Sequence, residues 1–244
     1  MKVRPVLLLA ILAWVAALGW AFSYEAGPTQ VPARPGVASM PAVADNSTVA
    51  KQAEWPPAEP DLATATFASG CFWCTQFDFD HLPGVVSTTT GYIGGRTERP
   101  TYYEVASGRT GHVEALEVKY DPARLSYAKL LDYYWHHVDP LDGNGQFCDR
   151  GEEYRPVIFT HDGEQEKLAT ESRAALEASK RFSRPIAVSI APAGKFWPAE
   201  AVHQKFYKTH QWRYSFYRLG CGRDARLEAL WGKQSLPATS EPTN

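Results

Sequence analysis

The chain has little cysteine and little net charge. Among its 244 residues there are four cysteines at uneven spacing, and the formal net charge is −2. Four cysteines are too few to hold together a disulfide-scaffolded fold, so the thiols are open to a catalytic or redox role. The near-neutral balance also lacks the basic stripe that nucleic-acid binding requires. We therefore expect no nucleic-acid partner.

Close spacings of metal ligands are missing as well. The sequence contains no tandem pair of CxxC motifs, and neither His136-His137 nor His203 with His210 has the tight spacing of a zinc site. We therefore expect no metal ion.

Polar side chains are absent from Val6 to Phe22, directly after a short basic start. That length lies at the lower limit for a membrane span and exceeds a typical signal-peptide core. Residues 1–22 are therefore predicted to be either a signal peptide or an N-terminal membrane anchor. Because the positive charges precede the apolar run, both alternatives export the remainder. We expect a periplasmic protein, or one anchored through residues 6–22 with its folded domain outside the cytoplasm.

The rest of the chain divides by composition. Residues 23–61 are rich in proline and alanine and show neither helical nor strand periodicity, which is typical of an extended, disordered linker. A folded domain is expected over 62–233, followed by a disordered tail over 234–244. Strands are predicted at 65–68, 85–90, 111–120, 154–160 and 186–190, and helices at 71–82, 101–107, 126–135, 162–182, 199–210 and 224–231. This pattern predicts an α/β (α+β) two-layer sandwich with a mixed central sheet flanked by helices around a ferredoxin-like core.

Cys71 is the strongest candidate nucleophile in this domain. A short β-prone run reaches Ser69-Gly70, and apolar residues then recur at helical intervals, so Cys71 should begin a helix. The helix N-terminus stabilises a thiolate by only ~0.3–1 kcal/mol, which lowers the pKa by less than one unit. A second group must therefore assist. Cys74 follows at i+3, and the pair is alternatively explained as two small core residues.

Glu114 is the candidate for that second group. In the predicted strand 111–120 it shares a face with His112 and Leu116. If this face is buried, desolvation raises the pKa of the carboxyl and keeps it protonated at neutral pH. A neutral carboxylic acid is a proton donor. The alternative is a solvent-exposed glutamate on an edge strand.

Several ordered motifs together resemble the A-type peptide methionine sulfoxide reductases. The match extends from about Thr66 to His210, and Gly-Cys-Phe-Trp is already specific by itself. The motifs are Gly70-Cys71-Phe72-Trp73, Pro83-Gly84-Val85, Gly91-Tyr92-x-Gly94-Gly95, Pro100-Thr101-Tyr102, Gly111-His112-x-Glu114-Ala115, Asp139-Pro140, Asp149-Arg150-Gly151 and Tyr154-Arg155.

The resemblance implies reduction of the S-epimer of methionine sulfoxide, free or in proteins, without a metal or organic cofactor. It implies that a thioredoxin-like reductant closes the cycle. By motif, Cys71 is the nucleophile and Glu114 the acid. The resemblance further implies that Tyr102, Tyr154 and Asp149 hydrogen-bond around the substrate, and that Phe72 and Trp73 form the wall of the methyl pocket.

Two cysteines are candidates for the second thiol of the cycle, the one that resolves the oxidised Cys71. Cys221, between two glycines, resembles the family's recycling cysteine and is the first choice, so a Cys71–Cys221 disulfide is expected after turnover. Cys74 is the alternative, because a CxxC pair at a helix N-terminus forms a disulfide in thioredoxin-like proteins. Cys148 is expected to be a buried bystander.

Two other functions compete with this one. A thiol–disulfide oxidoreductase built on Cys71 and Cys74 would keep its activity in Glu114→Gln. A non-enzymatic binding module that uses Trp73 would keep its function in Cys71→Ser. Neither alternative explains the Gly-Tyr-x-Gly-Gly and Gly-His-x-Glu motifs.

Overall fold

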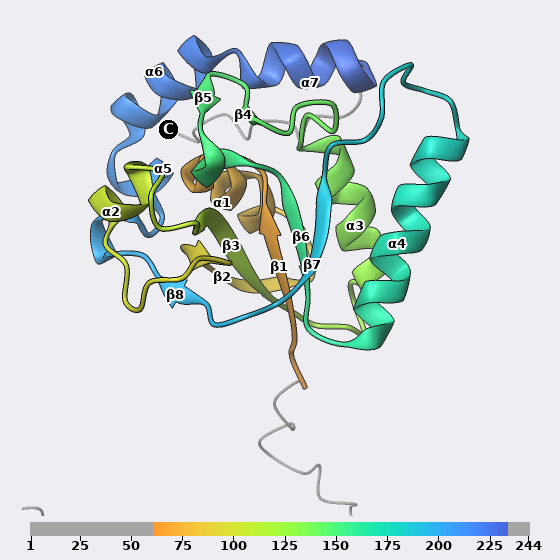
Figure 1. Ribbon diagram of the computed structural model, residues 1–244, viewed down its shortest axis with the longest axis horizontal. Helices are drawn as coiled ribbons and strands as arrows, with labels where there is room; N and C mark the ends of the chain where they lie inside the picture. Colours follow the sequence, from red (N-terminus) through yellow and green to blue (C-terminus); the bar gives the residue numbers. More distant parts are fainter. Residues whose placement is uncertain (1–60, 234–244) are drawn as a thin grey trace, which may run out of the picture. The chain divides into compact units, whose positions relative to one another are not determined.

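Strands and helices are interspersed along residues 61–233, the part of the chain that the computed structural model describes (Figure 1). The strands are β1 (Ala63–Ala68), β2 (Val85–Ile93), β3 (Val113–Tyr120), β4 (Gly145–Gln146), β5 (Asp149–Arg150), β6 (Val157–Thr160), β7 (Ser189–Pro192) and β8 (Trp197–Pro198). The α-helices are α1 (Phe72–Asp80), α2 (Tyr102–Ala106), α3 (Tyr127–His136), α4 (Gly163–Ala178), α5 (Phe206–Thr209), α6 (Gln211–Cys221) and α7 (Arg223–Trp231). Short 3-10 helices form at Glu152–Tyr154 and Ala201–His203.

The two predicted terminal segments, 1–22 and 234–244, and the predicted linker up to residue 60 lie outside the described residues. Among residues 61–233, no helix is both long enough and apolar enough to cross a membrane.

Within the described residues, six strands form a mixed sheet in the order β7-β6-β1-β3-β2-β8. Neighbouring strands are antiparallel except β6 and β7, which are parallel. Helices flank this sheet, with α3 and α4 packed against each other and α6 and α7 running along one end of it (Figure 1). These features confirm the predicted α/β class. β1, the strand that leads to Cys71, lies between β3 and β6 at the centre of the sheet.

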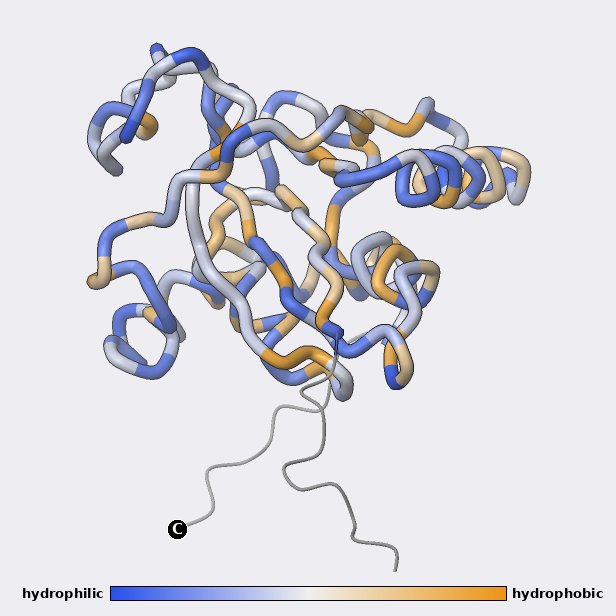
Figure 2. The backbone as a smooth tube through the Cα atoms, turned by 90° about the horizontal axis from the view of Figure 1, so that it is seen from below, coloured by the Kyte–Doolittle hydropathy of each residue, from blue (hydrophilic) through white to orange (hydrophobic). Residues whose placement is uncertain are grey.

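The main hydrophobic core lies between the sheet and the helices. In β3, Leu116 and Val118 belong to this core, which also contains Phe79 from α1 and Leu130 from α3. Val113 and its neighbours on the opposite face form a second cluster. Hydrophobic and hydrophilic residues alternate along the strands and helices, as expected of elements with one face in a core (Figure 2).

The C-terminal part departs most from the predicted elements. The helix expected over 199–210 is a 3-10 helix and the short α5, separated at Lys205, whose φ of +52° interrupts any continuous helix. The helix α6 was missed, and β6 and β7 begin later than predicted. The predicted helix 126–135 forms as α3, and Ser126 caps it, because its side chain accepts a hydrogen bond from the Lys129 N–H.

Candidate active site

Cys71 lies where the chain turns from β1 into α1. Gly70 before it has a φ of +83°, a conformation that favours glycine. A Cβ at Gly70 would also lie 2.5 Å from the Cβ of Gln146. The sharp turn therefore requires glycine, and it places Cys71 at the N-cap of α1 as predicted.

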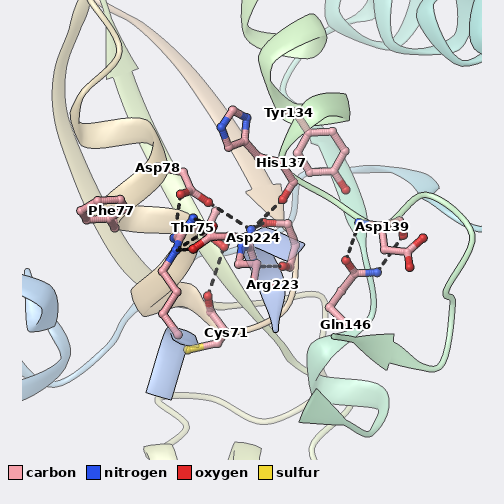
Figure 3. A network of polar contacts seen from close by, with 12 residues as sticks. Cys71, Thr75, Phe77, Asp78, Tyr134, His137, Asp139, Gln146, Arg223 and Asp224 are labelled. Carbon is pink, nitrogen blue, oxygen red and sulfur yellow. Dashed lines mark hydrogen bonds and ion pairs between the residues drawn. The ribbon is translucent and has the colours of Figure 1, made fainter. Parts of the chain in front are cut away.

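A buried charge cluster supports the same turn (Figure 3). Arg223, which is 1% exposed, donates to the carbonyls of Ser69 at 2.9 Å and His137 at 2.6 Å. Asp78 pairs with Arg218 at 2.8 Å and with Arg223 at 3.2 Å. Burial raises the pKa of Asp78, but the two guanidiniums outweigh it and bring this pKa below its ordinary value. The cluster ties α1, α6 and α7 to the turn before Cys71.

Glu114 comes to the same place from β3. It lies on the helix-covered face of the sheet with Leu116, and it is 3% exposed. Its Oε2 accepts a hydrogen bond of 3.0 Å from the backbone N–H of Phe72, the residue after Cys71. Glu114 is therefore bound to the first turn of the helix that Cys71 begins.

Burial shifts the pKa values of both groups upward. Desolvation raises the pKa of Glu114 to about 8, because its effect exceeds that of the Phe72 N–H bond, which lowers it. Desolvation also raises the pKa of Cys71 well above its usual value, with further contributions from Cys74 and Glu114. At neutral pH the site therefore contains a protonated carboxyl beside a protonated thiol.

A small cavity of about 50 Å³ joins these two groups to four other predicted site residues. Its lining also includes Tyr217 of α6, which the sequence did not identify. The lining residues are Cys71, Trp73, Tyr102, Glu114, Asp149, Tyr154 and Tyr217. The structure thus brings together residues from α1, α2, β3, β5, the 3-10 helix Glu152–Tyr154 and α6.

The polar lining is rich in protonated groups. Burial raises the pKa of Tyr102 to about 12, and it raises that of Tyr154 further, so both phenols remain donors. Burial also raises the pKa of Asp149, although a hydrogen bond from the Tyr217 hydroxyl opposes the shift. Tyr102 and Tyr154 therefore offer O–H donors to an oxygen atom placed in this cavity.

Two aromatic residues predicted to form the methyl pocket occupy different places. Trp73 lines the cavity, held by stacking on Phe206 with ring centres 3.8 Å apart and by its Nε1–H, which donates to His203 at 3.1 Å. Phe72 lies outside the lining and packs behind it against Tyr92. Its side chain supports the cavity, while its backbone N–H holds Glu114.

Cys74 is buried one turn beyond Cys71 and is a free thiol. A hydrogen bond from the Cys71 thiol lowers the pKa of Cys74 against the effect of burial, and Arg223 and Arg218 lower it further. The two sulfurs are therefore in contact, and negative charge is favoured on Cys74 rather than on Cys71.

The other two cysteines form a disulfide between Cys148 and Cys221, with an S–S distance of 2.07 Å. Cys148 is exposed, so its prediction as a buried bystander was wrong. The loop before β5 brings it to the C-terminal end of α6, where Cys221 lies. Asp149, which lines the cavity, is 3.8 Å from the Cys148 sulfur and 4.0 Å from the Cys221 sulfur. The disulfide is thus separated from the cavity by a single side chain.

Metal ligands gather at one place among residues 61–233, at Cys148, Asp149 and Cys221. Two of these three potential ligands are consumed by the disulfide in this structure.

Comparison with known proteins gives the same assignment from several sources. The sequence profile described as peptide methionine sulfoxide reductase matches residues 63–235. A peptide methionine sulfoxide reductase MsrA of Listeria welshimeri is 52% identical over 170 residues, which cover 70% of this chain and 96% of the relative. One from Bacillus licheniformis is 51% identical and covers the same share of this chain and 94% of the relative.

Solved structures agree. Methionine sulfoxide reductase A of Corynebacterium diphtheriae has a TM-score of 0.55 at 32% identity, over 62% of this chain and 76% of that one. The reduced form of Mxr1 from Saccharomyces cerevisiae has a TM-score of 0.58 at 27% identity, over 62% and 88%.

The mixed sheet, with a thiol and a neutral carboxyl lining one cavity, defines the protein as a thiol-based enzyme. More specifically, the chain belongs to the peptide methionine sulfoxide reductase family, A type. Its activity is the reduction of methionine sulfoxide.

Proposed function

We propose that the enzyme reduces the S-epimer of methionine sulfoxide, protein-bound and free, by attack of the Cys71 sulfur on the sulfoxide sulfur with Glu114 as proton donor. The observation that carries the proposal is that both groups line one cavity and that the pKa of Glu114 is about 8. A thiol alone is insufficient, because displacing the sulfoxide oxygen unprotonated would release an oxide.

The first step balances with these two groups. A bond forms between the Cys71 sulfur and the substrate sulfur as Glu114 protonates the oxygen, and the Glu114 carboxylate recovers the thiol proton. The hydroxyl then passes to the Cys71 sulfur, which leaves methionine and a sulfenic acid. The sulfoxide is reduced by two electrons and Cys71 is oxidised by two. Tyr102 and Tyr154 stabilise the oxygen by hydrogen bonds as its charge develops.

Selection of one epimer follows from the shape of the cavity. In this proposal Trp73 faces the methyl group, and Glu114, Tyr102 and Tyr154, which line the same cavity, donate to the sulfoxide oxygen. With the methyl and the oxygen fixed, only one configuration at sulfur directs the lone pair away from the attacking thiol and leaves the rest of the substrate outside.

The sulfenic acid is resolved in steps that use all four cysteines. Cys74, in contact with Cys71, attacks it and releases water, giving a Cys71–Cys74 disulfide. The Cys221 thiolate attacks Cys71 and releases Cys74. Cys148 then attacks Cys221 and releases Cys71, which gives the Cys148–Cys221 disulfide. Two contacts support this order: the hydrogen bond between Cys71 and Cys74, and the bond between Cys148 and Cys221.

Peptide mapping separates these steps. After excess sulfoxide without reductant, Cys148→Ser should accumulate a Cys71–Cys221 linkage, and Cys221→Ser should accumulate a Cys71–Cys74 linkage. A Cys71–Cys148 linkage in Cys221→Ser would contradict the proposed order. Because Cys148 is exposed, the final disulfide is accessible to a thioredoxin-like dithiol, the proposed reductant.

The proposed location is outside the cytoplasm. The support is the basic start and the apolar run Val6 to Phe22 in the sequence. Alkaline phosphatase is active only after export, so it serves as a reporter when fused after residue 22. We expect this fusion to be active. An inactive reporter would contradict export.

The reaction class is tested with a racemic methionine sulfoxide peptide. Chiral chromatography after exhaustive reaction with dithiothreitol should show half of the sulfoxide consumed and the R-epimer left. Cys71→Ser is the control and should consume neither. Equal loss of both epimers, or loss of neither, would overturn the proposal.

A further inference from the structure

Arg223, the first residue of α7, is fully enclosed by protein. It is 1% exposed, although arginine side chains are rarely buried to this extent. Its guanidinium donates to the carbonyls of Ser69 at 2.9 Å and His137 at 2.6 Å, and it pairs with Asp78 at 3.2 Å (Figure 3). These contacts fasten the start of α7 to the turn between β1 and α1.

The same guanidinium also contacts the segment that carries Cys148, a member of the outer cysteine pair (Cys148 and Cys221). Its central carbon lies 4.5 Å from the ring centre of Phe147, the residue directly before Cys148. Phe147 is half-buried and has a φ of +55°, which a bulky residue adopts only when its surroundings hold it there. Stacking under the guanidinium supplies such a contact. Arg223 therefore connects the loop before Cys148 with the helix that follows Cys221.

The proposed exchange requires Cys221 to bond to two partners in turn. It first attacks a sulfur of the buried cysteine pair (Cys71 and Cys74), and it is then attacked by Cys148. Both segments must therefore be held near the end of α6.

The end of α6 has freedom to move, whereas the start of α7 is held. Cys221 is flanked by Gly220 and Gly222, and a Cβ at either glycine would meet no atom within 4 Å outside its own chain neighbours and helix backbone. Gly222 has a φ of +68°, which breaks the chain between the two helices. Directly after it, Arg223 is anchored by its buried contacts. The cysteine that moves is thus attached to a helix start that does not.

Resting on the proposed function, we propose that Arg223 is a positioning residue for the thiol exchange that moves oxidation from the buried to the outer cysteine pair. It acts through the two segments that it contacts, because Ser69 lies two residues before Cys71 and Phe147 lies directly before Cys148. With both segments fixed to the start of α7, the exchanging sulfurs are kept within reach of one another.

The exchange balances without an external oxidant or reductant, because one disulfide replaces another. A bond forms between Cys221 and Cys71 as the Cys71–Cys74 bond breaks, and the electron pair leaves on Cys74. Arg223 helps to lower the pKa of Cys74, which makes this thiolate a good leaving group. Cys148 then bonds to Cys221, and Cys71 leaves as a thiolate. Each outer thiol loses its proton to solvent as it attacks, and Cys71 regains one from there.

Rapid quenching separates the exchange from the first chemical step. Fully reduced enzyme is mixed with one equivalent of sulfoxide without reductant, quenched with acid, alkylated and analysed by mass spectrometry. The methionine formed reports the first step, and the Cys148–Cys221 disulfide reports the exchange.

Arg223→Lys tests the role directly. Lysine keeps the charge beside Asp78, but it cannot donate to two carbonyls and lie flat over Phe147 at the same time. The exchange should slow by about 10–100-fold, the effect of misplacing reacting groups by about 1 Å. Methionine formation should slow less, because the Phe72 N–H holds Glu114 independently of Arg223. Equal slowing of both steps would assign Arg223 to the fold of the turn alone, and an unchanged exchange would also overturn the proposal.

Phe147→Leu tests the same role without altering a buried charge, and it decides the matter if Arg223→Lys does not fold. It should slow the exchange by about two- to fivefold, the usual contribution of a cation–π contact, and leave methionine formation unchanged. The matched control is Phe182→Leu, which removes another half-buried ring beneath a guanidinium, that of Arg181 at 5.9 Å, in the loop after α4. It should change neither step. A wild-type exchange rate in Phe147→Leu would contradict the proposal.

Failure of the proposed function gives a different result. If the unaltered enzyme formed methionine but no Cys148–Cys221 disulfide, the proposed exchange would be contradicted, and with it any role of Arg223 in it. Absence of methionine would contradict the proposed reaction. A normal exchange in both Arg223→Lys and Phe147→Leu would refute the role of Arg223 alone.

Discussion

The two pairs of cysteines differ in every physical respect that governs thiol chemistry. Cys71 and Cys74 are buried, free and in contact with each other beside a neutral carboxyl. Cys148 and Cys221 lie at the surface end of α6 and are joined in a disulfide. Burial suits the first pair to a reaction from which water must be excluded, whereas exposure suits the second pair to exchange with another protein.

The comparison also shows why one pair does not serve both purposes. A cavity of about 50 Å³ is too small for the active-site loop of a reducing protein. Moving the disulfide to the surface resolves this conflict. Asp149 lies between the two regions, lining the cavity and contacting both outer sulfurs.

Removing the proposed proton donor, Glu114, should produce the largest effect. Glu114→Gln keeps the size of the side chain and an oxygen that accepts the Phe72 N–H, but it removes the acidic proton. We expect kcat/KM for sulfoxide to fall by about 10²–10⁴, the usual contribution of general acid catalysis. Reduction of the Cys148–Cys221 disulfide by thioredoxin should be unaffected. If Glu114→Gln slowed sulfoxide reduction and disulfide reduction equally, the two cysteine pairs would not act as separate sites.

The second-largest effect is expected from the buried charge cluster of Asp78, Arg218 and Arg223. Asp78→Asn leaves Arg218 and Arg223 buried without their shared carboxylate, and we expect a loss of roughly 3–5 kcal/mol in the free energy of unfolding. Urea denaturation measures this loss. The matched control is Asp132→Asn, which removes an exposed carboxylate beside His136 and should cost under about 1 kcal/mol. Similar losses in the two variants would show that the cluster does not support the fold.

Thiol accessibility gives the smallest expected difference. In fully reduced protein at pH 7.5, iodoacetamide should modify Cys148 at least about tenfold faster than Cys71, because burial keeps the Cys71 thiol protonated and shielded. Mass spectrometry of timed samples measures the order. Faster labelling of Cys71 would show that its environment is not as protective as the buried geometry indicates.

Local periodicity placed the two central residues but left their roles open. The strand–glycine–helix pattern put Cys71 at a helix start, and the alternation in strand 111–120 put Glu114 on the face of Leu116, which the structure shows to be buried. The roles of the two residues came from the resemblance. The resemblance supplied Tyr102, Asp149 and Tyr154, whose convergence on one cavity no single segment indicates.

The features that were missed depend on long-range contacts. Cys148 and Cys221 are 73 residues apart, and neither local sequence indicates that the two cysteines pair. The Asp78 cluster gathers arginines from the C-terminal helices beneath α1, and sequence alone places such charges on the surface. Tyr217 was not predicted to line the cavity because its helix, α6, was not predicted. This helix begins soon after Lys205, whose backbone is left-handed.

The pH dependence of kcat/KM for sulfoxide, with dithiothreitol as the reductant, tests the pairing of Cys71 with Glu114 most directly. Glu114 must be protonated to act, and its pKa is about 8, so the wild-type rate should fall as the pH rises through about 8. The Glu114→Gln variant has no proton to lose there, so its much lower rate should show no such fall. The same descending limb in both enzymes would contradict the assignment of Glu114 as the proton donor.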